Sequence, residues 1–186
     1  MDPLSNVDRL IQWFGENGGH LNETIELLHS LEYGYHYVAA SRPINPKETV
    51  CTCPFSLTLS HLNVIPASPA GVRNYSPDSI CSKLIDNPRI DMSTIGILFL
   101  AEQRLKGRDS FWFPYIQLLP TETEMSTPLW FKGEELVYLK GTNLFSNDTR
   151  REQTSIGLQE GQYREQWKLG IAELEDAGES TDGFTW

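Results

Sequence analysis

The stretch that decides the fold is Gly107-Arg-Asp-Ser-Phe-Trp-Phe-Pro-Tyr-Ile-Gln-Leu-Leu-Pro120. It places four aromatic side chains within the five positions from Phe111 to Tyr115. A short polar loop in water does not support so many rings, so we expect them to anchor the packing of a core. Pro114 and Pro120 should bracket a short helical turn, because proline starts or stops a helix and is not tolerated inside one.

Two further motifs follow in order, Thr127-Pro-Leu-Trp-Phe131 and then Glu134-Glu-Leu-Val-Tyr-Leu-Lys-Gly-Thr142. This order resembles a segment of SET-domain lysine methyltransferases of the Rubisco large-subunit methyltransferase type, which include ribosomal-protein methyltransferases and many fungal proteins. In that family the segment is a helical insert without chemistry of its own. The resemblance covers residues 7 to 175 and implies methyl transfer from S-adenosylmethionine to a protein lysine.

The bulk composition narrows the class of protein. With 186 residues and 39% hydrophobic residues, the chain can bury the core of one domain. It contains no apolar run near the ~20 residues of a membrane helix, and its first residues lack a secretory signal. A formal net charge of −10 argues against a non-specific nucleic-acid binder. We therefore expect a cytoplasmic or nuclear protein without nucleic-acid or membrane partners, and the resemblance implies a protein substrate or partner.

The three cysteines are Cys51, Cys53 and Cys81, an odd number that fits reduced thiols when no signal peptide is present. Cys51 and Cys53 should share one face of a strand. Zinc would need two further ligands, and only Cys81 and scattered histidines are available, so we predict no metal site. Free cysteine behaves as a small hydrophobe, so we expect all three thiols to be buried.

The N-terminal residues 5 to 17 predict an amphipathic helix, because apolar residues recur at helical spacing: Val7, Leu10, Ile11 and Phe14. Ser5 is the predicted N-cap, with Asp8 three residues later as in a capping box. Gly18 should end the helix, since glycine adopts a left-handed conformation without a steric penalty.

Between residues 20 and 59 the pattern favours strands. The expected strands are Ile25–Leu27, Tyr33–Ala40, Glu48–Cys53 and Phe55–Leu59. After a polar loop, the sequence Ser76-Pro77-Asp78 should start a helix that runs towards Ile85. Helical patterns then occupy Met92–Leu105, Glu134–Leu139 and the region from 147 to 174.

The predicted fold class is therefore α+β, with a small antiparallel β unit followed by a mainly helical part. In the terms of the resembled family, residues 1–19 form an N-terminal helix and residues 20–90 form the first SET half. Residues 91–175 form the helical insert, and residues 176–186 form an acidic loop.

The family's β half carries a Gly-x-Gly turn whose main chain contacts S-adenosylmethionine, because glycine allows a ligand close to the backbone. Here Gly34 stands for the first glycine and His36 replaces the second. The resemblance implies cofactor contacts around Glu32, Gly34, Tyr35 and His36. Two alternatives stay open: His36 could block or hydrogen-bond the cofactor, and the segment could be an ordinary tyrosine-rich hairpin.

SET enzymes also need a second half, with an Asn-His motif and a later tyrosine at the methyl-transfer site. Catalysis there is mainly orientation of a deprotonated lysine in a narrow channel. No Asn-His pair occurs here, and the end at Asp182-Gly-Phe-Thr-Trp186 resembles the point where the family's chain continues. We expect a truncated, inactive portion without catalytic residues. The alternative is a non-catalytic SET-like protein whose helical insert binds a partner. The face exposed by the missing half would be a large apolar patch, and such patches tend to be interaction surfaces.

Overall fold

The computed structural model describes residues 5–30, 34–39, 41–66, 75–142, 144 and 155–185. Its helices are α1 (Asn6–Glu16), α2 (Met92–Lys106), α3 (Phe113–Ile116) and α4 (Ser155–Asp176). Its strands are β1 (His20–Leu21), β2 (Ile25–Ser30), β3 (Gly34–Ala39) and β4 (Cys51–Thr52). Short 3₁₀ helices connect them: η1 (Phe55–Leu57), η2 (His61–Val64), η3 (Ile80–Leu84), η4 (Gly107–Asp109), η5 (Glu122–Glu124), η6 (Pro128–Trp130) and η7 (Gly133–Leu139).

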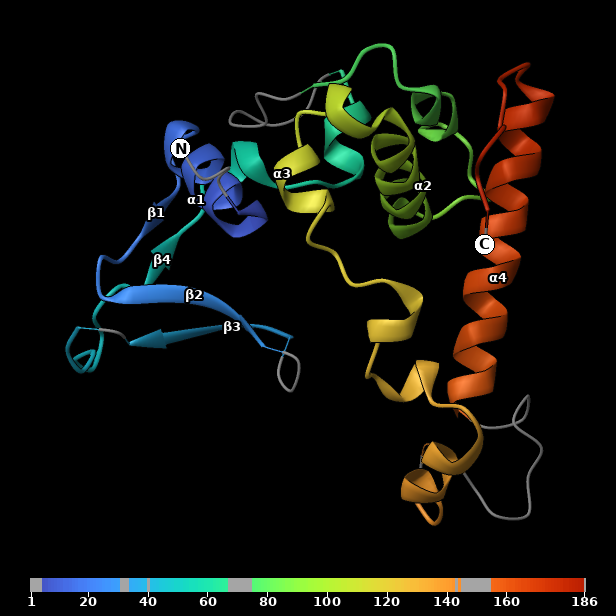
Figure 1. Ribbon diagram of the computed structural model, residues 1–186. Helices are drawn as coiled ribbons and strands as arrows, with labels where there is room; N and C mark the ends of the chain where they lie inside the picture. The colour runs from blue at the N-terminus through green and yellow to red at the C-terminus, as the bar shows by residue number, and fades with distance from the viewer. Residues whose placement is uncertain are drawn as a thin grey trace.

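The strands form two small antiparallel pairs, β1 with β4 and β2 with β3. The β2–β3 register runs from Ile25 opposite Ala39 to Ser30 opposite Gly34. Both pairs lie at one end of the molecule beside α1, while α2 and α4 lie at the other end (Figure 1). The predicted α+β class, strands first and helices after, is confirmed.

Helix α1 begins where its local signals predict. The Ser5 side chain accepts a hydrogen bond from the Asp8 amide, and the Asp8 carboxylate accepts one from the Ser5 amide. This reciprocal capping box satisfies donors that the first helical turn leaves free. The helix ends at Glu16, and Gly18 follows with a φ of +85°.

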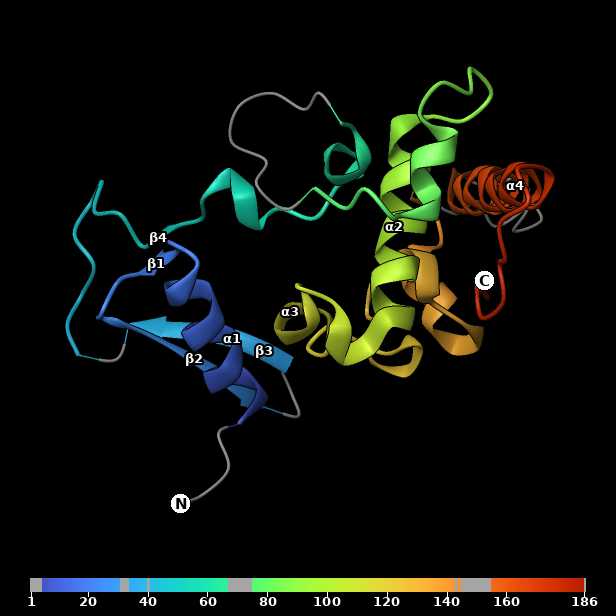
Figure 2. The same ribbon diagram turned by 90° about the horizontal axis from the view of Figure 1, so that it is seen from above.

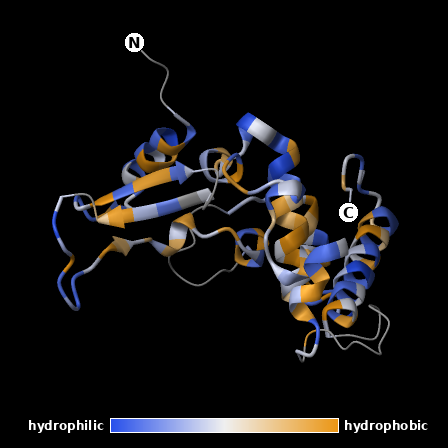
Figure 3. Ribbon diagram, turned by 60° about the horizontal axis from the view of Figure 1, so that its bottom comes forward, coloured by the Kyte–Doolittle hydropathy of each residue, from blue (hydrophilic) through white to orange (hydrophobic). Residues whose placement is uncertain are grey.

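The hydrophobic core lies among α2, α3, the C-terminal part of α4 and the 3₁₀ helices η2 and η3, and α2 and α4 lie side by side (Figure 2). The middle of α2 is almost continuously hydrophobic, whereas α4 alternates along its length (Figure 3). Trp112, 1% exposed, packs edge-on against Phe99 at 5.5 Å between ring centroids. Its indole Nε1 donates a hydrogen bond to the Leu57 carbonyl over 3.1 Å. The prediction of an aromatic anchor is confirmed for Trp112 and for Phe111, which packs against the core, and it is wrong for Tyr115, which is 41% exposed.

Three local predictions were wrong. Of the strand expected at Glu48–Cys53, only Cys51–Thr52 forms a strand, β4. Residues 55–59 do not form a strand: η1 follows Pro54, with Leu57 N bonded to the Pro54 carbonyl and the Thr58 hydroxyl to the Phe55 carbonyl. Phe55 is half-exposed while Leu57 is buried. The alternating apolar residues therefore belong to a turn that places Leu57 in the core. The helix expected from Ser76 begins only after Ser79, as the 3₁₀ helix η3.

Candidate functional site

The β2–β3 hairpin carries the residues that sequence reasoning placed at a cofactor site. Gly34 opens β3 opposite Ser30, with a φ of +62° that side-chain-bearing residues rarely adopt. A Cβ added at Gly34 would meet no atom of the described residues within 4 Å. The main chain at Gly34 is therefore open to close approach by a ligand.

The structure brings Gly34, Tyr35 and His36 together as consecutive residues of β3, while Glu32 lies outside the described residues. The His36 imidazole Nδ1 lies 3.0 Å from the Gly34 carbonyl oxygen. Because a carbonyl only accepts, this contact requires the tautomer with a proton on Nδ1. His36 therefore folds back onto the turn and donates to the Gly34 carbonyl, a contact that a second glycine could not make.

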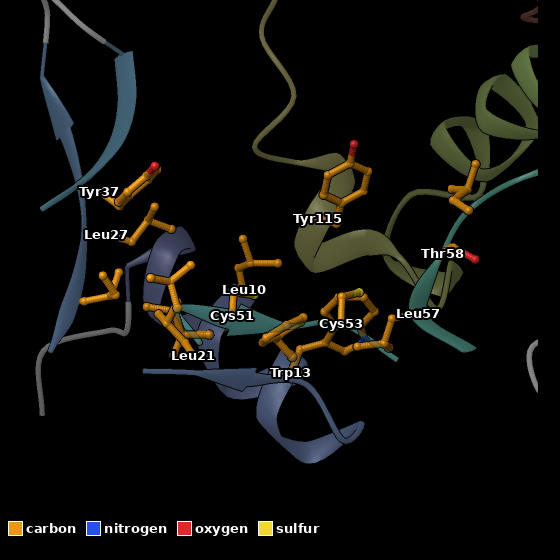
Figure 4. Close-up of a pocket in the computed structure, with 15 residues that line it drawn as sticks. Leu10, Trp13, Leu21, Leu27, Tyr37, Cys51, Cys53, Leu57, Thr58 and Tyr115 are labelled. Carbon is orange, nitrogen blue, oxygen red and sulfur yellow. The ribbon is translucent and has the colours of Figure 1, made fainter. Parts of the chain in front are cut away.

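A second feature is an apolar groove of about 670 Å³ between α1, the strands, η1 and α3. Figure 4 shows Leu10 and Trp13 of α1, Tyr37 of β3 and Tyr115 of α3 around it. Among the described residues, no charged side chain lines the groove. The rim of the groove is open to solvent, because Tyr37 is 69% exposed and Tyr115 is 41% exposed. This size and composition match those of small-molecule sites and of incompletely covered cores.

Sequence reasoning expected an exposed apolar face but did not locate this groove. The sequence of α1 contained a signal for the groove, because its apolar stripe predicted a face that needs covering. No residue of α1 is buried, and Leu10, Ile11 and Phe14 of that stripe line the groove instead. The neighbouring strands β1 and β4 are only two residues long, so they offer too little sheet to cover α1. The apolar stripe of α1 therefore stays partly exposed to solvent.

The prediction of buried thiols holds for Cys81 and is wrong for Cys51 and Cys53, which are both exposed and line the groove. Burial raises the pKa of Cys81 to about 12. Desolvation, and then the neighbouring Cys51, raise the pKa of Cys53. Cys51 and Cys53 escape burial because β4 is two residues long and, within the described part of the chain, pairs with β1 alone.

A polar cluster of Ser79, Glu102 and Lys106 stabilises the packing of η3 on α2. The Glu102 side chain of α2 is largely buried, accepts a hydrogen bond from Ser79 and pairs with Lys106 at 3.0 Å. Each member is satisfied by the others, so the cluster ties η3 to α2 and leaves no group for a ligand. Within the described ranges no three His, Cys, Asp or Glu residues are arranged to hold a metal ion. No helix in those ranges is long and apolar enough to cross a membrane.

Comparison with known proteins gives matches among protein methyltransferases. Ribosomal lysine N-methyltransferase set10 of Schizosaccharomyces pombe is 27% identical over 145 residues, 75% of this chain and 24% of that protein. The actin-histidine N-methyltransferases of Gallus gallus and Homo sapiens are 32% and 31% identical over 136 residues. The chain is a distant relative of SET-domain protein methyltransferases.

The matched region is 72% of this chain for the actin-histidine enzymes but only 20% of their length, so the chain spans a quarter or less of these relatives. No family model and no solved structure matches the chain significantly. The methyltransferase relationship covers both parts of the fold, since 136 to 145 matched residues exceed the length of either the β unit or the helical part.

Proposed function

We propose that this chain acts in S-adenosylmethionine-dependent methylation of a protein lysine and that its β2–β3 hairpin forms one wall of the cofactor site. The observation that carries the proposal is the distant homology to protein methyltransferases over about three quarters of the chain. Lysine is our proposed acceptor because the aromatic insert motifs resemble the ribosomal-protein type. As part of the same proposal, the boundary between β half and insert lies near residue 90.

The hairpin partly fits the cofactor. Gly34 leaves open space where a Cβ would lie, so its main chain is available to a ligand. In our proposal Tyr35, which follows it in β3, belongs to the same wall. His36 Nδ1 already donates to the Gly34 carbonyl, so in our proposal His36 fixes the turn. When bound, S-adenosylmethionine would supply the methyl group. The role of these residues is to bind and orient it.

We further propose that these residues do not transfer methyl groups unaided. In our proposal the hairpin supplies one wall of the site, so the contact that it makes with the cofactor is one-sided. Methyl transfer needs the acceptor held in line with the sulfonium methyl, which requires walls on several sides. A one-sided site should bind weakly and orient poorly.

The test is calorimetric titration of the purified chain with S-adenosylmethionine, comparing Gly34→Ala with Gly133→Ala. Both glycines have positive φ, +62° and +54°, and both face open space, so alanine should strain each by a similar ~1–2 kcal/mol. We expect saturable binding to the wild type, at least tenfold weaker binding to Gly34→Ala, and unchanged binding to Gly133→Ala. Equal losses in both variants, or no binding to the wild type, would reject the hairpin site.

One observation favours the alternative of a non-catalytic protein-interaction module. The apolar groove leaves Ile11, Tyr37 and Val50 at 37%, 69% and 41% exposure, which is unusual for large apolar side chains gathered at one place. The same titration separates the two functions when it is combined with a circular dichroism melt. A cooperative melt without cofactor binding would support the module.

A further inference from the structure

Two free thiols lie on the wall of the apolar groove, and neither belongs to the cofactor hairpin. Cys51 is the first residue of β4, and Cys53 follows two positions later. Both are exposed and line the groove. Figure 4 places Cys53 beside Trp13 and Leu57, with Cys51 towards Leu10 and Leu21. Each nucleophilic sulfur is thus flanked by apolar side chains.

The side chains that line the groove determine which kind of reagent can bind next to these thiols. The groove holds about 670 Å³, within the range of small-ligand sites, and no charged side chain among the described residues lines it. A ligand that fills it should therefore be mostly apolar and uncharged along its length, as an aliphatic chain is. Because the rim is open to solvent at Tyr37 and Tyr115, a polar group at one end of the ligand can stay in water.

We propose that the groove accommodates a long aliphatic acyl chain and that Cys51 or Cys53 carries the acyl group as a thioester. The donor class is a long-chain acyl thioester such as an acyl-coenzyme A. The protein sulfur attacks the acyl carbonyl carbon and forms a new carbon–sulfur bond. The donor's own carbon–sulfur bond breaks, and the proton of the protein thiol ends on the leaving thiol, so no oxidant or reductant is needed.

The contribution of the groove is to bind the chain next to the thiol. Desolvation raises the pKa of Cys53, so its thiolate is scarce near neutral pH and its intrinsic reactivity is low. Acylation should therefore depend on how long the donor stays bound rather than on chance collision. Each methylene that leaves water should strengthen this binding about fourfold.

The experiment incubates the folded 186-residue chain with acetyl-, octanoyl- and dodecanoyl-coenzyme A below their micelle concentrations. Adducts are counted by intact mass spectrometry and identified as thioesters by release with hydroxylamine. We expect octanoyl transfer at least about a hundredfold faster than acetyl transfer. The double variant Cys51→Ser/Cys53→Ser keeps the buried Cys81 and should form no adduct. The two single variants show which sulfur reacts.

A matched pair of surface variants tests the groove itself. Val50 is 41% exposed and lines the groove, whereas Val137 is 52% exposed and lies on η7. Val50→Asp should slow octanoyl transfer at least tenfold, and Val137→Asp should not change it. In guanidinium, acetyl and octanoyl donors should react alike. Equal rates for both donors on the folded chain, an adduct on the double variant, or equal effects of the two aspartates would overturn the proposal.

Discussion

At the residue scale, Glu48 shows how one side chain orders the loop between β3 and β4. Its carboxylate forms an ion pair with Arg42, accepts the Asn45 amide at 3.0 Å and accepts the Asn22 side chain at 3.1 Å. The hydrogen bond from Arg42, followed by those from Asn45 and Asn22, lowers the pKa of Glu48 from 4.5 to about 2. These hydrogen bonds therefore stabilise the ionised form of the Glu48 carboxyl in the folded loop.

This shift gives stability a pH dependence of known sign. Because folding lowers the pKa of Glu48, its contribution is fully present above pH 4.5 and is lost as the pH falls through about 2. Glu48→Gln should therefore reduce the dependence of the unfolding free energy on pH between pH 4.5 and 2. Urea unfolding at several pH values in that range measures this dependence. Arg42→Gln keeps the carboxylate and removes its main partner, so it should flatten the same window. An unchanged pH slope in both variants would contradict this assignment.

The two exposed cysteines illustrate what residue-level reasoning misses. Free cysteine prefers burial, and Cys81 of η3 follows that preference in the core cluster. Burial also needs a covering layer, which depends on how much chain packs above a given strand. The sequence pattern at Cys51 contains no information on that layer, so the preference predicted the wrong environment.

At the element scale, the predictions that succeeded rested on signals within one element. The capping box at Ser5 and the apolar run of α2 are read from neighbouring residues, and both helices begin within a residue of their predicted start. The strand predicted at residues 55–59 failed because Pro54 and the Thr58 hydroxyl stabilise a turn there. The contact of Leu57 with Trp112, 55 positions away, fixes that turn from outside.

The crossing of α2 and α4 depends on one glycine. A Cβ at Gly170 would lie 2.5 Å from Cδ1 of Leu98, a fully buried side chain that would have to shift to make room. Gly161, on the same helix, faces open space. The two glycines therefore differ in packing while sharing the helical backbone conformation.

Alanine at these two glycines should have opposite effects. Gly170→Ala should destabilise the fold by about 1–3 kcal/mol, because it overpacks a filled core. Gly161→Ala should stabilise it by up to ~1 kcal/mol, because alanine is the better helix former. Urea unfolding of both variants beside the wild type measures the two changes. Destabilisation of similar size in both would show that the helices do not cross at Gly170.

At the scale of the whole molecule, the two ends of the fold are stabilised unequally. The buried cluster belongs to the helical end, where Leu98, Phe99 and Trp112 have at most 1% exposure. The β end has strand pairs of two and six residues and a groove along its apolar side. Two-stranded hairpins are marginal without a layer against them. The resemblance seen in the sequence could predict both parts and their order, but not this imbalance, because packing density depends on which faces meet.

Amide hydrogen exchange should reveal the imbalance directly. Opening free energies range from near zero in weakly packed segments to the global value in the core. We expect β2 and β3 amides to exchange at least a hundredfold faster than those of α2, measured by mass spectrometry of peptic peptides at constant pH. If the hairpin binds S-adenosylmethionine, a saturating concentration should slow exchange in β2–β3 and leave α2 unchanged, since a ligand stabilises only the states that bind it. Equal protection of β3 and α2 without ligand would mean that the β end is as stable as the core, and the open groove would then need a different explanation.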